Sequence, residues 1–143
     1  MAVVIDDRLL LDVLAGQAPG ELTAELGGGG VFVTSAWYYR LGRAVFGSSG
    51  AGVLSGRLAA LDRDVTERVR AELGDLPSNV GLLHPRVVVP LMFTLRVRRQ
   101  LNVLAAEALA VALLLPARLL VTTDSPLLRS AAEETGIDYQ VLD

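Results

Sequence analysis

The sequence predicts an α/β fold: a three-layer α/β/α sandwich with a mainly parallel central sheet, formed by a single domain over residues 1–143. Short aliphatic runs that suit buried strands alternate along the chain with segments in which apolar residues recur every three or four positions. A chain of 143 residues with 52% hydrophobic content fills one core but is too short for two. Alternating strands and helices favour parallel pairing, because each helix returns the chain to the same end of the sheet.

In the first half of the chain, strands are expected at residues 2–5 and 31–33, each followed by a helix. Asp6 or Asp7 can cap the first of these helices, and Thr34 or Ser35 can cap the second. A short helix over 21–26 and the glycines at 27–30 separate the two units. One long amphipathic helix is expected over 54–73, because apolar side chains repeat along one side of this segment.

In the second half, residues 85–100 leave two interpretations open. Val87–Val89 suits a strand, whereas Pro90 and the leucines that follow suggest a helix that starts late or is kinked. A buried helix over 103–115 and a strand over 119–122 follow. Ser125 and Pro126 then begin a short helix that ends at Gly136, and residues 137–142 form the last strand.

Composition excludes several classes of site. The chain has no cysteine, so it has no disulfide, thiolate zinc site or cysteine nucleophile. Its single histidine, His84, precedes Pro85 in a predicted turn, and no catalytic triad can be completed around it. The net charge of −3 gives no overall attraction to nucleic acid, so an RNA partner would require a local basic patch. A metal site would have to be built from carboxylates, which suit Mg²⁺ or Mn²⁺.

We expect no membrane segment and a cytoplasmic location. The N-terminus lacks the pattern of a secretory signal peptide. The apolar stretch over 101–121 is long enough to test as a membrane span, but polar residues and a proline interrupt it. These interruptions are Asn102, Glu107, Pro116 and Arg118, and they favour a water-soluble core instead.

Three acidic residues stand out by their positions. Glu107 interrupts an otherwise aliphatic helix, where its charge must be neutralised, paired or bound to a metal. Asp6 and Asp124 each follow a predicted strand, at the edge where ligands of open α/β sheets gather. If these acids converge, a divalent cation would offset their repulsion. Structural interpretations also exist: Asp6 or Asp7 and Asp124 or Ser125 as helix caps, and Glu107 paired with Arg8 or Arg40.

These residues resemble motifs of the PIN domain family, metal-dependent ribonucleases that include the toxins of VapBC toxin–antitoxin pairs. The similar stretches span essentially the whole chain: Val3–Asp6 followed by Leu9–Leu11, Ala106–Ala108, and Leu120–Asp124 followed by Leu127, Leu128 and Ala131. The resemblance implies that Asp6, Glu107 and Asp124 are catalytic and hold Mg²⁺ or Mn²⁺, with Asp7 as a further ligand. The metal would activate a water molecule for attack on an RNA phosphodiester. It also implies an antitoxin protein and a homodimer as partners.

Two departures from the family pattern leave two functions open. Arg8 stands where the family usually has Ser, Thr or Asn. The helix after the strand over 31–33, which contains Ala36–Arg40, lacks the usual glutamate, since no acid occurs between residues 26 and 61. The first function is a ribonuclease that works with three acids, in which arginines hold RNA phosphates and Trp37, Tyr38 or Tyr39 stacks a base. These arginines are Arg40, Arg43, Arg96, Arg98 and Arg99. The second is a catalytically degenerate PIN-like binding or regulatory protein.

Overall fold

A parallel five-stranded sheet forms the centre of the computed structural model, which describes residues 1–47, 53–98 and 100–142. The strand order is β3-β2-β1-β4-β5, and every neighbouring pair is parallel. The strands are β1 (Ala2–Ile5), β2 (Val31–Val33), β3 (Val80–Gly81), β4 (Ala117–Val121) and β5 (Tyr139–Val141). The predicted α/β class and the parallel sheet are therefore confirmed.

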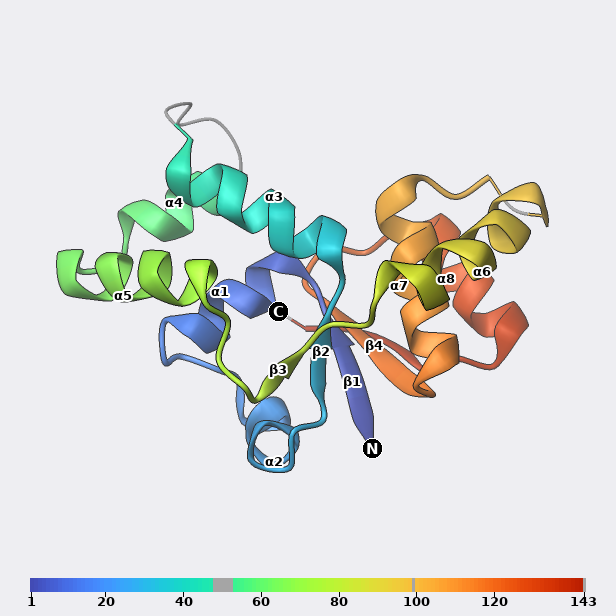
Figure 1. The fold of residues 1–143 in the computed structure, drawn as a ribbon, viewed down its shortest axis with the longest axis horizontal. Coiled ribbons are helices and arrows are strands. Elements are labelled where there is room, and N and C mark those ends of the chain that lie inside the picture. The colour runs from blue at the N-terminus through green and yellow to red at the C-terminus, as the bar shows by residue number, and fades with distance from the viewer. Residues whose placement is uncertain (48–52, 99, 143) are drawn as a thin grey trace.

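The helices form two groups, one on each side of the sheet (Figure 1). One group contains α1 (Asp7–Leu14), α3 (Ser35–Phe46), α4 (Val53–Ala59) and α5 (Arg63–Gly74), and the other contains α6 (Pro85–Arg98), α7 (Val103–Leu114) and α8 (Pro126–Thr135). The chain steps outward from β1 to β3 and then reverses to β4 and β5. Because crossovers between parallel strands are right-handed, this reversal places the later helices on the opposite face. A 3-10 turn (Gly20–Leu22) and α2 (Thr23–Gly27) lead into β2.

Strand β1 lies at the centre of the sheet. Its residues Val3, Val4 and Ile5 are fully buried, as expected for a strand that is covered on both faces. Val3 is aligned with Val31 of β2 and with Arg118 of β4, so the three strands end at a common level. The residues that follow β1, β2 and β4 therefore meet at one edge of the sheet.

The single helix expected over 54–73 is wrong, because the structure has two helices, α4 and α5, in this segment. A tight turn ends α4, in which the Leu61 amide donates to the carbonyl of Leu58, and the extended backbone of Asp62 starts α5. Before this turn, Arg57 of α4 forms an ion pair with Asp12 of α1. Periodicity alone could not reveal the break, since both helices present apolar residues to the same core.

In the region that the sequence left open, residues 85–98 form the helix α6, with Pro90 inside it, so the strand interpretation of Val87–Val89 is wrong. Pro85 begins the helix, where its fixed φ angle suits the first turn, and the His84 carbonyl accepts hydrogen bonds from the amides of Val87 and Val88. The sequence did not predict β3, which has only two residues. None of the helices in the described segments is long and apolar enough to cross a membrane.

Candidate functional site

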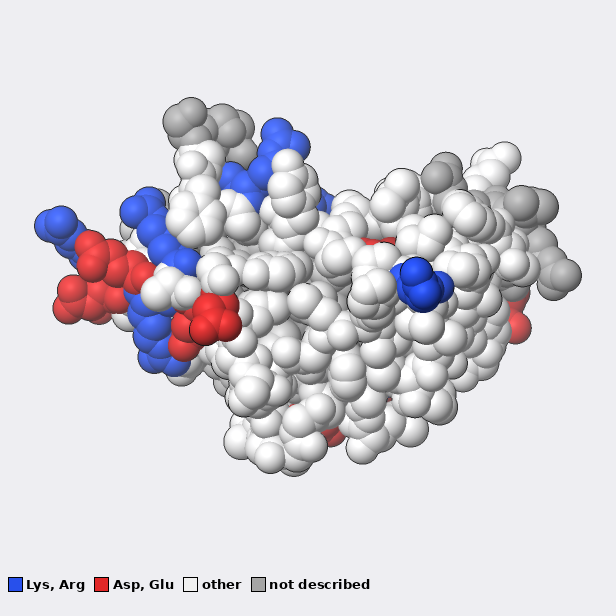
Figure 2. All heavy atoms as spheres, in the orientation of Figure 1, with Lys and Arg blue, Asp and Glu red and all other residues white. Residues whose placement is uncertain are grey.

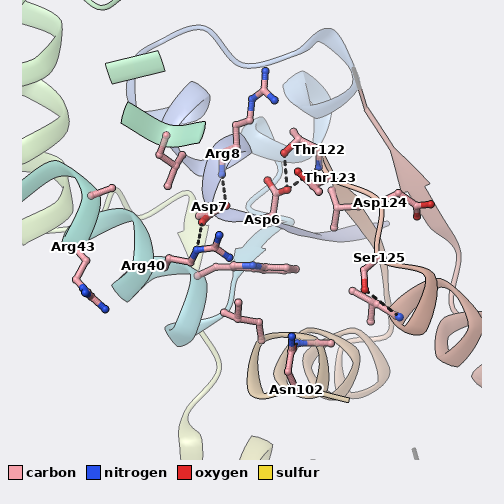
Figure 3. Close-up of a pocket in the computed structure, with 17 residues that line it drawn as sticks. Asp6, Asp7, Arg8, Arg40, Arg43, Asn102, Thr122, Thr123, Asp124 and Ser125 are labelled. Atoms are coloured by element: carbon pink, nitrogen blue, oxygen red, sulfur yellow. Dashed lines mark hydrogen bonds and ion pairs between the residues drawn. The ribbon is translucent and has the colours of Figure 1, made fainter. Parts of the chain in front are cut away.

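A cavity of about 540 Å³ lies at the carboxyl edge of the sheet (Figure 3). Residues from five parts of the chain line it: the start of α1, one side of α3, Leu54 of α4, the start of α7, and the segment from the end of β4 into α8. Its polar and charged lining includes Asp6, Asp7, Arg8, Arg40, Arg43, Asn102, Thr122, Thr123, Asp124 and Ser125. The predicted position of the site, beyond the carboxyl ends of the strands, therefore coincides with a cavity.

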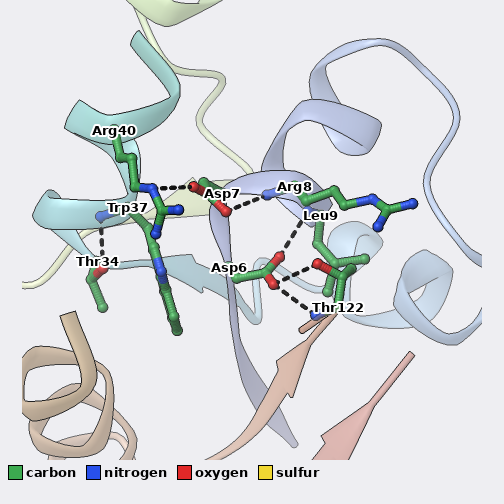
Figure 4. A network of polar contacts seen from close by, with 8 residues as sticks. All are labelled: Asp6, Asp7, Arg8, Leu9, Thr34, Trp37, Arg40 and Thr122. Carbon is green, nitrogen blue, oxygen red and sulfur yellow. Dashed lines mark hydrogen bonds and ion pairs between the residues drawn. The ribbon is translucent and has the colours of Figure 1, made fainter. Parts of the chain in front are cut away.

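Asp6 connects the beginning of α1 to the end of β4 (Figure 4). Its Oδ1 accepts a hydrogen bond from the Leu9 amide at 2.9 Å, which makes Asp6 the cap of α1. Its Oδ2 accepts two hydrogen bonds from Thr122, from the amide at 2.7 Å and from the hydroxyl at 2.8 Å. Both carboxylate oxygens are thus satisfied by neutral donors, and the capping interpretation of Asp6 is confirmed.

Asp7 is buried next to Asp6 and faces an arginine. Its Oδ1 accepts a hydrogen bond from the Arg8 amide at 2.9 Å. Its Oδ2 has no hydrogen-bond partner among the described residues, but lies 3.4 Å from Nε of Arg40 on α3. Burial raises the pKa of Asp7, and the charge of Asp6 adds to the rise, while the Arg40 guanidinium opposes it. Arg40 is therefore the cation that offsets the charge of Asp7.

Glu107 binds the first turn of α3. Its Oε2 accepts a hydrogen bond from the Ser35 hydroxyl at 2.5 Å, and its Oε1 accepts one from the Ala36 amide at 2.8 Å. The amino end of a helix carries partial positive charge and unpaired amides, so it stabilises a carboxylate in an otherwise apolar helix. Glu107 is not among the described residues that line the cavity. The partners of Glu107 are therefore Ser35 and Ala36, and not Arg8 or Arg40 as the structural interpretation expected.

Asp124 lines the cavity but directs its carboxylate away from Asp6 (Figure 3). Its Oδ1 accepts hydrogen bonds from Arg129 Nε at 3.1 Å, from Arg129 Nη2 at 3.0 Å and from the Tyr139 hydroxyl at 3.1 Å. The Arg129 guanidinium lies 4.8 Å from the centre of the Tyr139 ring. The next residue, Ser125, caps α8 by accepting a hydrogen bond from the Leu128 amide, as the sequence predicted.

These contacts do not assemble the three-acid centre that the resemblance implies. Asp6 and Asp7 lie side by side, whereas Glu107 binds α3 and Asp124 binds Arg129 and Tyr139. In the described part of the chain, no group of three or more His, Cys, Asp or Glu side chains is placed to hold a metal ion. The donor set therefore does not fit a centre for Mg²⁺ or Mn²⁺ made of Asp6, Glu107 and Asp124.

The arginines predicted to bind RNA fall into two sets. Arg40 and Arg43 both line the cavity. Arg96 and Arg98 belong to the last turns of α6, where the structure does not describe the side chains, and Arg99 lies outside the described residues. Sequence reasoning missed Thr122, whose amide and hydroxyl both bind Asp6. Only the pairing of β1 with β4 brings these two residues together, because 116 positions separate them in the chain.

No protein-family model matches the chain, and no curated protein matches it. The resemblance to PIN domains therefore rests on the order and spacing of the motifs in the sequence.

We predict that Glu107→Ala lowers the free energy of unfolding by about 1–3 kcal/mol, because it leaves the Ala36 amide and the Ser35 hydroxyl without their acceptor. Glu107→Gln should cost less, since its amide oxygen can still accept the Ala36 hydrogen bond. Urea unfolding measures both changes. Glu133→Ala, at an exposed position of α8, is the matched control. If Glu107→Ala and Glu133→Ala lower the free energy of unfolding equally, the contacts of Glu107 with the first turn of α3 do not stabilise the fold.

We also predict that Asp7 gives the stability a characteristic pH dependence. Because its pKa is raised in the folded protein, folding favours the protonated carboxyl, and its contribution to stability is lost as the pH rises from the usual value of 3.8 through the raised pKa. Asp7→Asn cannot ionise, so it should show a smaller fall in the free energy of unfolding over this range. Urea unfolding at a series of pH values measures the difference.

The control for the pH series is Asp138→Asn, which removes a carboxyl group at an exposed position. This variant should retain the pH dependence of the wild type. If Asp7→Asn also retains it, burial of Asp7 is not its source.

Proposed function

We propose that this protein is a catalytically degenerate PIN-like module that binds single-stranded RNA at the cavity without cleaving it through a metal ion. One observation carries the proposal: the Arg40 guanidinium faces the buried carboxylate of Asp7, with Nε 3.4 Å from Oδ2. A divalent cation held by Asp7 would have to occupy this same space. An arginine stays charged at any physiological pH, so Arg40 offsets part of the charge of Asp7 without a metal.

Basic side chains at the cavity supply the contacts that RNA phosphates require. Arg40 uses Nε toward Asp7, which leaves the Nη donors of its guanidinium for a phosphate. Arg8 and Arg43 also line the cavity, and neither forms an ion pair with an acidic residue that the structure describes. Because no acid occurs between residues 26 and 61, α3 is locally basic in a chain whose net charge is −3. This local charge supports binding of a polyanion.

A metal-dependent ribonuclease is the second candidate, and Asp7 also favours it. Its Oδ2 is buried without a hydrogen-bond donor from the described residues, and burial raises the pKa of the carboxyl group. A metal cation next to Asp6 and Asp7 would give Oδ2 of Asp7 a partner and would lower the raised pKa, as Arg40 does in part. This candidate requires Arg40 to move away and the other predicted acids, Glu107 and Asp124, to change partners. An antitoxin partner, a homodimer and a cytoplasmic location remain predictions under either candidate.

We predict that the wild-type protein binds a fluorescein-labelled single-stranded RNA in the presence of EDTA, as measured by fluorescence anisotropy. Arg40→Gln and Arg43→Gln should each weaken binding similarly for all sequences, because phosphate contacts carry no sequence information. Each lost contact should also reduce the slope of log affinity against log salt by about 0.7. Arg63→Gln, whose side chain is 91% exposed on α5, should leave the affinity unchanged.

Two results would contradict this proposal. If the wild type does not bind RNA, or if all three arginine variants bind as the wild type does, the cavity is not an RNA site. If RNA is cleaved in the presence of Mn²⁺, and both Asp6→Asn and Asp7→Asn abolish the cleavage, the ribonuclease candidate is correct instead.

A further inference from the structure

We propose that an apolar groove on the outer side of α3 is a base-stacking subsite for the single-stranded RNA that the cavity binds. This inference rests on the proposed function, because the RNA backbone has to be held at the cavity. The groove has a volume of about 440 Å³, and its lining includes Tyr38, Tyr39, Gly42, Phe46 and Leu73. Arg43 lines both the groove and the cavity, so the two hollows share an edge.

Two aromatic side chains of the groove are largely exposed to solvent. Tyr39 is 69% exposed and Phe46 is 63% exposed, although the opposite side of α3 is buried in the core through Trp37, Leu41 and Val45. Exposed rings of this size cost free energy in water unless a partner covers them. Stacking on aromatic rings is the usual way in which proteins hold unpaired RNA bases.

The spacing along α3 leaves room between the rings. Tyr39, Gly42, Arg43 and Phe46 lie at positions i, i+3, i+4 and i+7, so they share one face of the helix over about two turns. Gly42 contributes no side chain to this face, and a Cβ atom placed there would meet nothing within 4 Å. The face therefore has an aromatic ring at each end, an open floor between them and a guanidinium at its edge.

Charge identifies RNA as the occupant in preference to an apolar protein segment. No acidic side chain is among the described residues of the groove, and Arg43 forms no ion pair with a described acid. In Figure 2, basic side chains lie over α3 at the top of the view, whereas basic and acidic side chains are mixed over α5 at the left. A polyanion with exposed bases satisfies both the cation at the edge and the rings. A purely apolar partner would bury Arg43 without a counter-charge.

The test measures binding of a fluorescein-labelled single-stranded RNA in EDTA by fluorescence anisotropy. Tyr39→Ala and Phe46→Ala should each weaken binding by about 5- to 100-fold, the range found when a stacking ring is removed. Tyr39→Phe should retain the wild-type affinity, since it keeps the ring. Gly42→Leu should weaken binding, because its side chain fills the floor of the groove without a clash at Cβ. Circular dichroism checks that each variant is folded.

Phe93→Ala is the matched control, because Phe93 is 66% exposed on a different helix, α6, and its loss should leave RNA affinity unchanged. Double-stranded RNA gives a second control: its bases are already stacked, so its affinity should not depend on Tyr39 or Phe46. The two controls show whether RNA affinity falls because a stacking ring is lost or because any change of an exposed aromatic residue lowers it.

The proposal of a base-stacking subsite and the proposal of RNA binding at the cavity would be contradicted by different outcomes. If Tyr39→Ala and Phe46→Ala bind RNA as the wild type does while Arg40→Gln is impaired, the subsite is wrong and the cavity proposal stands. If the two alanine variants instead alter the oligomeric state in sedimentation and leave RNA affinity unchanged, the groove is a contact between copies and the subsite is also wrong. If the wild type does not bind RNA at all, both proposals fail.

Discussion

Buried carboxylates at the carboxyl edge of the sheet constrain how the surrounding elements are placed. A buried charge is tolerated only where donors or opposite charges compensate it, so each acid fixes the element that compensates it. Asp6 holds the first turn of α1 and the end of β4, Asp7 holds Arg40 of α3, and Glu107 holds the amino end of the same helix. Helix α3 is therefore attached at two points, to Asp7 of α1 and to Glu107 of α7.

This attachment determines what the surface of α3 can do. With its amino end on Glu107 and Arg40 on Asp7, α3 places one basic side at the cavity and exposes its aromatic side to solvent. The same two contacts occupy Glu107 and Asp7, which the resemblance to PIN domains implies as metal ligands. If the proposed function is correct, the contacts that compensate Asp7 and Glu107 with protein groups are also the contacts that position α3 for RNA.

Local signals in the sequence were sufficient for much of the fold. The strands over 2–5 and 31–33 follow from their aliphatic runs, and Asp6, Thr34 and Ser125 are caps because each accepts a hydrogen bond from an amide three residues later. The break between α4 and α5 was not predictable, since it depends on a tight turn within an uninterrupted apolar pattern. Strand β3 has only two residues, too few to show the alternation of apolar and polar residues that predicts a strand.

The candidate site was only partly predictable, for a related reason. The sequence placed Asp6 and Asp124 at the carboxyl ends of strands, and β1 and β4 are neighbours in the sheet, so both residues line the cavity. Glu107, which was expected to join them, does not line it. The sequence could not say where each carboxylate points. The partners of Glu107 lie 71 and 72 positions away in the chain, and helix periodicity gives no information about contacts at that distance. The contact between Arg40 and Asp7 likewise depends on the placement of α3 against α1.

The most direct test of the central claim, that Arg40 compensates Asp7 where a metal would otherwise bind, is a calorimetric titration with Mn²⁺. The wild-type protein should show no binding at micromolar to low millimolar metal, whereas Arg40→Gln, which uncovers Asp7, should gain weak binding that Asp7→Asn removes again. Arg63→Gln should behave as the wild type. Tight Mn²⁺ binding by the wild type that is lost in Asp6→Asn and Asp7→Asn would contradict the claim.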